Sequence, residues 1–341
     1  MQFTYSNILE SLVQKKNLTE QESLWLMEQT MSGNLSPVQI GAWLVAIRLK
    51  GETADEISSF ARIMREKAVP VPNLSQPLID TCGTGGDKSS LINVSTLAAL
   101  VLASMNIKIA KHGNRAVSSK SGSADLLEKL GYPLNESPQE VSNRITNKNF
   151  GFLFAPSFHP AMKFAGPVRK ELGIRTVFNI LGPLANPAKA QIHLMGVFNK
   201  ELLQTMGSCM KKLGVTTALI VHSDDGLDEI SPIARTNYVL IDRDNMETGI
   251  IDPAPFALKI KSLEEIILKE SDDTLQRSLN ILKGKERAAT EVIALNVTAV
   301  LFLNDLYHNR TKQSIQTYLN HRIPEIIQYI ESNPVNLDSI F

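Results

Sequence analysis

Helix-like spacing of apolar residues covers the first seventy positions of the chain. Ile40, Trp43 and Ile47 recur at intervals of three and four residues, which places them on one face of a helix. Three capping boxes, which satisfy free N–H groups at helix starts, precede such runs. They pair Thr19 with Glu22, Ser36 with Gln39, and Thr53 with Glu56. Residues 1–72 are therefore predicted to form a small all-helical domain.

The pattern changes after the prolines at positions 70, 72 and 77, which predict a linker. Beyond them, short apolar runs alternate with helical stretches. The predicted strands cover residues 78–79, 107–110, 152–154, 192–197, 218–221 and 238–241, and the helices between them include 96–105, 124–130 and 200–213. This alternation predicts a larger α/β domain with a central mixed or mostly parallel sheet. The last eighty or so residues are predicted to be largely helical.

Two further proline clusters, at 156–167 and 183–187, flank a short helical stretch at 168–172. We expect about 165–188 to leave the sheet and join the helical domain. The α/β domain would then consist of 73–164 and 189–341. A cleft between two such domains is a common place for a substrate.

Composition narrows the function classes. Lys plus Arg equals Asp plus Glu at 35 each, so the chain lacks the basic excess of most nucleic-acid-binding proteins. Cys82 and Cys209 form no C-x-x-C pair, which favours a reducing cytoplasm over a disulfide framework or zinc knuckle. The N-terminus lacks the pattern of a signal peptide. Apolar runs such as 97–105 are too short to span a bilayer, so no membrane is expected as a partner. Because the charges balance, no nucleic acid is expected as a partner either.

The stretch DTCGTGGDKSS, at residues 80–90, places three glycines in four positions between a predicted strand and a predicted helix. Glycines let a ligand approach the main chain closely, and N–H groups at a helix start bind phosphate. Asn93, Ser95 and Thr96 add side-chain donors at that start. The spacing is neither a Walker loop nor a dinucleotide fingerprint. The alternative is an ordinary tight turn with a polar cap.

Two more polar stretches follow predicted strands. Residues 111–125, KHGNRAVSSKSGSAD, combine cations, hydroxyls and glycines, and loops at neighbouring strand ends would suit more than one phosphate. Residues 221–232, VHSDDGLDEISP, carry four acids, and carboxylates beside a polyphosphate are typical Mg²⁺ ligands. The alternative for each stretch is a solvated polar turn.

Together these stretches resemble the anthranilate phosphoribosyltransferase family, from the N-terminal helices to about residue 300. The matching motifs are GTGGD at 83–87, NVST at 93–96, KHGNR at 111–115, SS at 118–119, GSAD at 122–125, HPAM at 159–162, RT-FN-LGPLANP across 175–187, and GLDE at 226–229. The family transfers phosphoribose from phosphoribosyl pyrophosphate to the amino group of anthranilate, in tryptophan biosynthesis. The resemblance implies a small helical domain, a large α/β domain, a homodimer joined through the helical domain, and Mg²⁺ as cofactor.

The resemblance also implies site residues. The donor, phosphoribosyl pyrophosphate, would contact Gly83, Gly86, Asp87, Leu91, Asn93, Val94, Ser95, Thr96, Lys111, His112, Gly113, Asn114, Arg115, Ala116, Val117, Ser118, Ser119 and Ser123. Anthranilate would contact Gly83, Asn114 and Arg169, and the metal would contact Ser95, Asp228 and Glu229. Leu91 stands where family members commonly have Thr, so its contact lacks a hydroxyl. The aniline amine needs no dedicated acid or base, although His112 is a candidate to shape the acceptor site or receive a late proton.

Two other readings stay open on the sequence. A pyrimidine nucleoside phosphorylase would share the architecture and the glycine loop, but KHGNR and GLDE favour the transferase because phosphorolysis needs no pyrophosphate-bound metal. A non-catalytic relative that binds nucleic acid would need a basic face. The zero net charge and Arg169 count against it.

Overall fold

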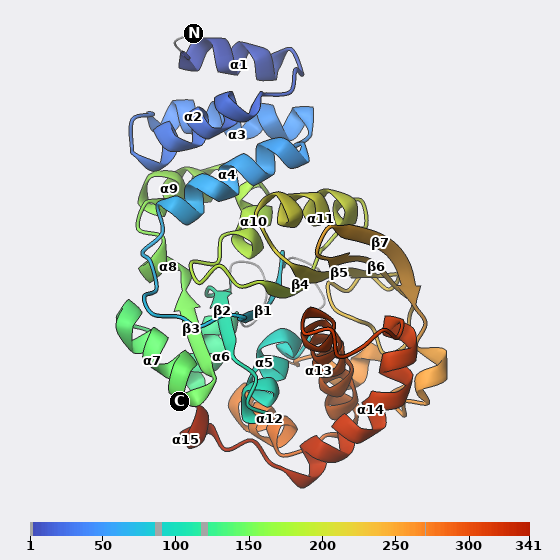
Figure 1. The fold of residues 1–341 in the computed structure, drawn as a ribbon. Coiled ribbons are helices and arrows are strands. Elements are labelled where there is room, and N and C mark those ends of the chain that lie inside the picture. The colour runs from blue at the N-terminus through green and yellow to red at the C-terminus, as the bar shows by residue number, and fades with distance from the viewer. Residues whose placement is uncertain (1–2, 86–90, 117–121, 270) are drawn as a thin grey trace.

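The first helices of the chain form a layer stacked on a larger α/β body (Figure 1). The structure is a computed structural model that describes residues 3–85, 91–116, 122–269 and 271–341. The N-terminal helices are α1 (Tyr5–Val13), α2 (Glu20–Met31), α3 (Pro37–Lys50) and α4 (Ala54–Glu66). All three predicted capping boxes are present. Trp43 is fully buried and packs against the rings of Phe60 and Phe178, whose centroids lie 5.6 and 6.3 Å away.

Phe178 belongs to a segment that returns to these helices from the middle of the chain. Helix α9 (Met162–Leu172) packs on α2 and α3, and α10 (Phe178–Leu181) packs on α4. Helix α9 begins earlier than the predicted stretch at 168–172 and continues through Pro167. This packing is what a return of about 165–188 to the helical domain requires, while the exact domain boundaries stay a prediction.

The α/β body is built on a seven-stranded sheet with the order β3-β2-β1-β4-β5-β6-β7. The strands are β1 (Ile79–Gly83), β2 (Ile109–Gly113), β3 (Phe150–Phe154), β4 (Ile192–Gly196), β5 (Thr217–Ser223), β6 (Thr236–Asp242) and β7 (Asn245–Ile251). Strands β1 to β5 pair in parallel, and β6 and β7 pair antiparallel. The predicted fold class, a small helical domain with a larger mixed-sheet domain, is therefore confirmed. Strand β7 was not predicted, because this edge strand is mostly exposed and lacks an apolar run.

Helices cover both faces of the sheet (Figure 1). On one face, α5 (Val94–Ser104) and α13 (Arg287–Tyr307) share a large apolar core with α14 (Ile315–Ser332). On the other, α11 (Leu202–Lys212) joins the core of the N-terminal helices. The remaining helices are α6 (Ser123–Lys129), α7 (Pro138–Lys148), α8 (Ala155–Phe158), α12 (Thr274–Leu282) and α15 (Leu337–Ile340). Strands buried on both faces read as continuous apolar runs, which is why β4 and β5 were predictable.

Helix α13 corrects one expectation from the sequence. Within the described part of the chain, it is the one helix long and apolar enough to cross a bilayer by length and composition, although the apolar runs had been judged too short. In the structure, 83% of its 18-residue apolar stretch is buried. It packs between α5, α14 and strands β4 and β5. Its position in the core explains why this helix is apolar on all sides.

Candidate functional site

The three polar stretches follow strands that end at one edge of the sheet. Strands β1 and β4 are neighbours, although the chain passes from β1 to β2 on the opposite side. In open α/β sheets, ligands bind at the carboxyl ends of strands where the strand order reverses in this way. Gly83 ends β1 and pairs with Gly196, which ends β4. The glycine loop therefore starts at the reversal point.

The main chain of the glycine loop contacts the acidic stretch. The N–H of Gly85 donates to Oδ2 of Asp228 over 3.1 Å, and Gly85 has a φ of +63°, which favours glycine. A Cβ on Gly83 would lie 2.9 Å from the same carboxylate oxygen. A Cβ on Gly196 would lie 1.5 Å from the main-chain oxygen of Asp228. Glycine at these strand ends is what lets the loop and the acids meet.

Lys111 connects the second stretch to the start of α5. Its side chain is buried, and Nζ donates to the hydroxyl of Ser95 over 3.2 Å and to the main-chain oxygen of Thr81. Burial lowers the pKa of Lys111, while the negative charges of Asp80 and Glu229 act against this shift. The ammonium of Lys111 lies beneath the N-terminus of α5, where the helix dipole also carries positive partial charge. The structure thus joins Lys111 to Ser95 and brings Glu229 close enough to affect Lys111 electrostatically, while the shared site of these residues stays a prediction.

Arg115 is already paired in this structure. Its guanidinium contacts the carboxylates of Glu128 at 2.7 Å and Asp125 at 3.1 Å, and it lies 5.7 Å from the ring centre of Phe154. The hydrogen bonds that it donates to Glu128 and Asp125 raise its pKa above the ordinary value. A contact between Arg115 and a donor phosphate would therefore have to share or replace these carboxylates.

Several predicted donor contacts have structural roles at the start of α5. Asn93 caps the helix, because its side-chain oxygen accepts the N–H of Thr96 over 3.3 Å. The side chains of Val94 and Thr96 are buried. Leu91 forms an isolated antiparallel bridge with Ile267 and packs against the large core. Any ligand contact from Leu91 or Val94 would thus come through the main chain, and these contacts stay predictions.

The remaining donor residues divide into two groups. Gly113 ends β2, Asn114 and Ala116 follow it, and Ser123 begins α6. The hydroxyl of Ser123 donates to the main-chain oxygen of Asn114 over 3.3 Å. The second group lies outside the described residues and comprises Gly86, Asp87, Val117, Ser118 and Ser119.

Arg169, the predicted carboxylate partner of anthranilate, lies on α9. Its guanidinium carbon lies 5.2 Å from the ring centre of Phe178, and burial lowers its pKa. Within the described residues, no hydrogen bond or ion pair joins Arg169 to an acid, to Gly83 or to Asn114. An arginine paired only with a ring retains its planar donor fork for a ligand carboxylate. The shared acceptor site of Arg169, Gly83 and Asn114 stays a prediction.

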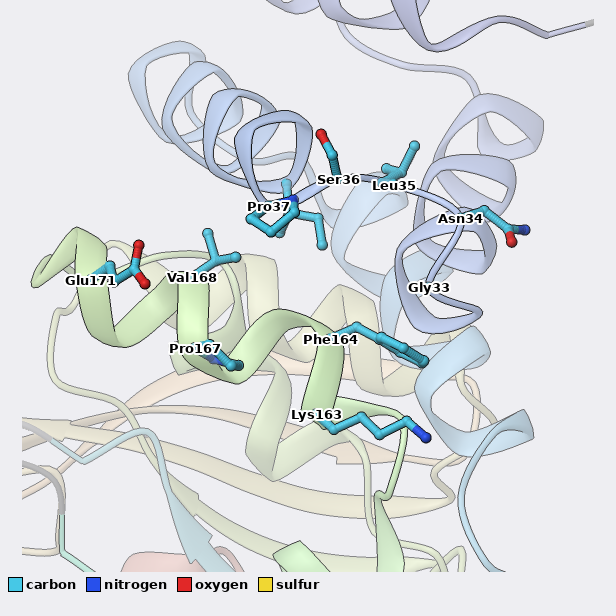
Figure 2. A pocket seen from close by; sticks show the side chains of 11 residues that line it. Gly33, Asn34, Leu35, Ser36, Pro37, Lys163, Phe164, Pro167, Val168 and Glu171 are labelled. Atoms are coloured by element: carbon cyan, nitrogen blue, oxygen red, sulfur yellow. The ribbon is translucent and has the colours of Figure 1, made fainter.

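A crevice of about 490 Å³ lies on another face of α9 (Figure 2). The turn between α2 and α3 forms one wall and α9 forms the other. The lining residues are Gly33, Asn34, Leu35, Ser36, Pro37, Ile40, Lys163, Phe164, Pro167, Val168 and Glu171. None of the predicted donor, acceptor or metal residues is among them. This crevice is therefore not the site that the sequence motifs describe.

His112 has the geometry of an orienting residue. Its Nδ1 lies 3.1 Å from the main-chain oxygen of Gly182, which can only accept, so Nδ1 carries the proton in the neutral ring. Burial, and then the neighbouring His159, lower the pKa of His112 to about 3. So weak a base does not take up a proton near neutral pH. The geometry favours an orienting role for His112 over a role as proton acceptor.

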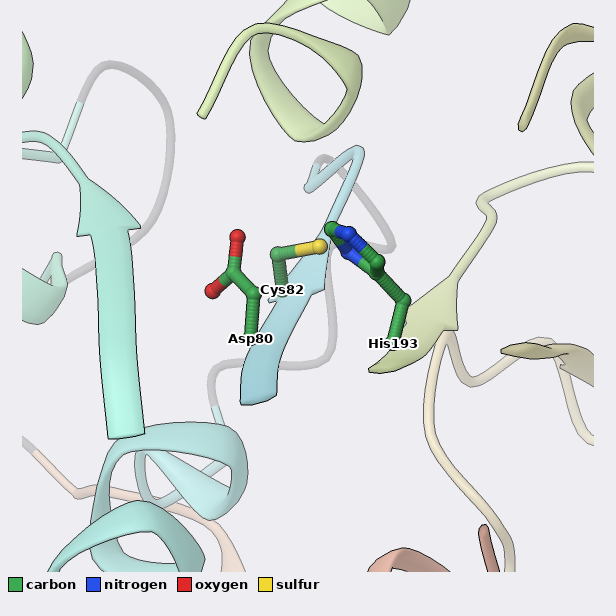
Figure 3. A group of neighbouring side chains, drawn as sticks. All are labelled: Asp80, Cys82 and His193. Atoms are coloured by element: carbon green, nitrogen blue, oxygen red, sulfur yellow. The ribbon is translucent and has the colours of Figure 1, made fainter. Parts of the chain in front are cut away.

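A largely buried polar cluster, which the sequence analysis missed, joins side chains from β1 and β4 (Figure 3). Ligand atoms of Asp80, Cys82 and His193 lie within 4.8 Å of one another. Both oxygens of Asp80 are already used, because they accept the N–H of His112 at 3.3 Å and the side-chain amide of Asn186 at 2.8 Å.

The chemistry of this cluster does not suit a metal ion. Burial raises the pKa of Cys82 well above its ordinary value, so its sulfur stays a neutral thiol rather than the thiolate that binds metals. The Arg65 guanidinium is also close enough to affect Asp80 electrostatically. The cluster instead ties β1 and β2 to the segment that carries Asn186. The sequence did offer one signal for Asp80, because an acidic residue beside an apolar strand needs a polar partner when it is buried.

Comparisons with known proteins agree with this arrangement. Residues 75–321 match the model of a glycosyl transferase family, a/b domain, and residues 6–68 match its helical bundle domain. The anthranilate phosphoribosyltransferase of Thermoanaerobacter sp. (strain X514) is 42% identical over 295 residues, which is 86% of this chain and 87% of that protein. The enzyme of the same name from Persephonella marina is 44% identical and covers 84% of this chain and 86% of its own.

Two solved structures extend the comparison. The anthranilate phosphoribosyltransferase of Thermus thermophilus superposes with a TM-score of 0.87 at 37% identity, covering 98% of both chains. The enzyme from Saccharomyces cerevisiae, solved in complex with PRPP and Mg, has a TM-score of 0.79 at 25% identity, covering 98% of this chain and 97% of its own.

The buried carboxyl of Asp80 predicts a specific pH dependence. Burial is the main cause that raises its pKa from 3.8 to about 6. Between these values the folded protein holds a proton that the unfolded chain releases, so the contribution of Asp80 to stability falls as the pH rises. The unfolding free energy of the parent, minus that of the Asp80→Asn variant, should decrease between about pH 4 and about pH 7. Urea unfolding at each pH measures it, and a constant or rising difference would contradict the assignment.

Proposed function

Because the chain belongs to the anthranilate phosphoribosyltransferase family, we propose that it transfers the 5-phosphoribosyl group from phosphoribosyl pyrophosphate to the amino group of anthranilate. The products are N-(5-phosphoribosyl)anthranilate and pyrophosphate, and the reaction belongs to tryptophan biosynthesis. The observation that carries the proposal is a pair of hydrogen bonds at the carboxyl ends of neighbouring strands. One joins Gly85 to Asp228, and the other joins Lys111 to Ser95. A nucleoside phosphorylase would not need the acids there, and a nucleic-acid-binding relative would not need the buried lysine.

The donor is proposed to lie with its phosphates between the glycine loop and the start of α5. As the bond to pyrophosphate breaks, negative charge grows on the leaving oxygens. Main-chain N–H groups at the start of α5, and the ammonium of Lys111 that binds Ser95 there, would stabilise that charge. Because these groups lie at the ends of strands, they would hold the donor in one orientation, which lowers the entropy cost of reaching the transition state.

Mg²⁺ is proposed to be held by Ser95, Asp228 and Glu229 together with the donor phosphates. Carboxylate and hydroxyl oxygens are the hard ligands that Mg²⁺ prefers. Asp228 contacts the glycine loop, and the negative charge of Glu229 affects Lys111, which binds Ser95. These contacts support placing the three oxygen-bearing side chains near one another, and their chemistry suits the ion. When bound, the ion would supply positive charge to the leaving pyrophosphate.

The acceptor is proposed to be anchored by the guanidinium of Arg169. A planar fork suits the carboxylate of anthranilate, and the neighbouring ring of Phe178 gives the guanidinium an apolar wall. The aniline amine is mostly neutral near pH 7, so it can attack the ribose carbon without a strong base. His112 then serves to hold β2 against Gly182.

A homodimer joined through the helical domain is proposed from exposed apolar side chains. On α3, Val38 is 81% exposed and Leu49 is 75% exposed, and Val13 at the end of α1 is 63% exposed. Large apolar side chains gathered on one domain are typical of an interface with another protein. Homodimers are the commonest assembly of this kind. Cytoplasmic localisation is also proposed, on the absence of cysteine pairing motifs in the sequence.

The reaction can be followed by the loss of anthranilate fluorescence. We expect the loss to require both phosphoribosyl pyrophosphate and Mg²⁺. The double variant Asp228→Asn with Glu229→Gln should reduce kcat by about 100-fold or more, since charge stabilisation of the leaving group is removed. If the parent and the double variant are equally active without added metal, the metal site is contradicted. Phosphate-dependent release of uracil from uridine would instead favour the phosphorylase alternative.

Arg169→Ala should raise the KM for anthranilate by about 10- to 100-fold, the cost of losing a charge-assisted pair. The KM for the donor should stay within about twofold, because Arg169 is assigned to the acceptor alone. Lys170→Ala, on the same helix but exposed, is the matched control and should change neither value. Equal increases in both KM values would refute the assignment.

The interface predicts that Val38→Asp combined with Leu49→Asp yields a monomer. A buried carboxylate on each partner would cost more than the apolar contacts contribute. Sedimentation velocity measures the change from the parent. Ile250→Asp, at another exposed apolar position on β7, is the control and should leave the dimer intact. A parent that sediments as a monomer would rule out the proposal.

A further inference from the structure

One carboxylate joins two segments of the proposed donor site that are separated along the chain. Asp125 stands at the third position of α6, and its Oδ2 accepts the main-chain N–H of Gly122 over 2.9 Å. This bond caps the helix. The same oxygen also accepts the main-chain N–H of Ala116 over 2.9 Å, and Oδ1 accepts the guanidinium of Arg115 over 3.1 Å. The last two bonds reach beyond the helix to the residues that follow β2.

The two segments are packed too closely for ordinary side chains. A Cβ on Gly122 would lie 2.3 Å from the main-chain nitrogen of Ala116, and a Cβ on Gly113 would lie 2.2 Å from the hydroxyl oxygen of Ser123. The main-chain oxygen of Asn114 accepts the N–H of Ala124 over 3.2 Å. Residues 113–116 and 122–125 therefore form one unit, with the carboxylate of Asp125 bonded to both parts.

The charge of Asp125 is balanced within this unit. Burial alone would raise its pKa, but the N–H groups of Ala116 and Gly122, and then Arg115, lower it below the ordinary value. The carboxylate is therefore ionised at neutral pH and fully occupied by protein donors. Arg115 is also held by Glu128 through two bonds of 2.7 and 2.8 Å. A carboxylate satisfied in this way is suited to hold the main chain rather than to bind an anionic ligand or a metal.

We infer that Asp125 is a positioning residue for the donor: it fixes the main chain at 115–116, and with it the segment that begins at Lys111, against α6. The inference rests on the proposed function. It adds to the capping role of Asp125 a role in donor affinity, since the segment it holds supplies Lys111 to Ser95 at the other end. Losing the anchor should loosen the donor phosphates most and affect anthranilate less, because Asn114 is the one predicted acceptor contact that lies in this unit.

Three variants test this role against a purely structural one. Asp125→Ala removes every bond of the carboxylate. Asp125→Asn retains an amide oxygen that can accept both N–H groups in place of Oδ2. Asp125→Glu keeps the charge and the helix cap, for which glutamate is well suited, but its longer side chain no longer fits the bond to Ala116. Glu140→Ala is the matched control, because Glu140 caps α7 in the same position by accepting the N–H of Ser137 over 2.7 Å.

The measured quantities are the two KM values, kcat and the melting temperature. Asp125→Ala should raise the donor KM about tenfold or more, and Asp125→Glu about fivefold or more, with a smaller increase in the anthranilate KM. Asp125→Asn should stay within about threefold of the parent. Glu140→Ala should lower the melting temperature and leave both KM values unchanged. Asp125→Glu keeps the test valid if Asp125→Ala does not fold.

A parent-like donor KM in Asp125→Glu would overturn the inference. Equal changes in both KM values for the Asp125 variants would also overturn it, because they would indicate a general loss of structure. These outcomes differ from a failure of the proposed function. In that case the parent itself would not consume anthranilate with phosphoribosyl pyrophosphate and Mg²⁺.

Discussion

The structure depends on the close approach of main chains at the carboxyl ends of β1 and β4. Gly83 and Gly196 pair there, and neither position has room for a side chain beside Asp228. This lets the N–H of Gly85 reach the carboxylate of Asp228, so the glycine loop and the acidic stretch are in contact. Parallel pairing adds β2, whose Lys111 reaches Ser95. Four segments that are distant along the chain thus meet because the sheet aligns their ends.

The same alignment places charges where they are costly without partners. Lys111 and Asp80 point to opposite faces of the sheet, and both are buried. Each is bonded to neighbours: Lys111 to Thr81 and Ser95, and Asp80 to Asn186 and the N–H of His112. Removing one partner from such a network leaves another group buried without a bond, which destabilises the fold. If the proposed donor site is correct, donor affinity and local stability depend on the same bonds at this edge of the sheet.

Much of this arrangement was predictable from the sequence because it depends on local patterns. Capping boxes located the N-terminal helices, and apolar runs located the buried strands. Motif order assigned Ser95, Lys111 and Asp228 to one site, and in the structure Lys111 binds Ser95 while Asp228 binds Gly85. Strand β7 escaped detection because an exposed edge strand has no apolar run. The roles of Asp80 and Asn186 could not be derived, because a hydrogen bond across 106 positions leaves no periodic signal. Similarly, nothing in the spacing of Arg115 and Glu128 indicates that they pair.

The central claim is that this edge of the sheet binds a diphosphorylated sugar together with a divalent cation. Isothermal titration calorimetry of the full-length protein with phosphoribosyl pyrophosphate tests it most directly. The account predicts saturable binding in excess magnesium chloride and much weaker binding in the presence of a chelator. The absence of any binding heat in excess magnesium chloride, at several temperatures, would contradict the account.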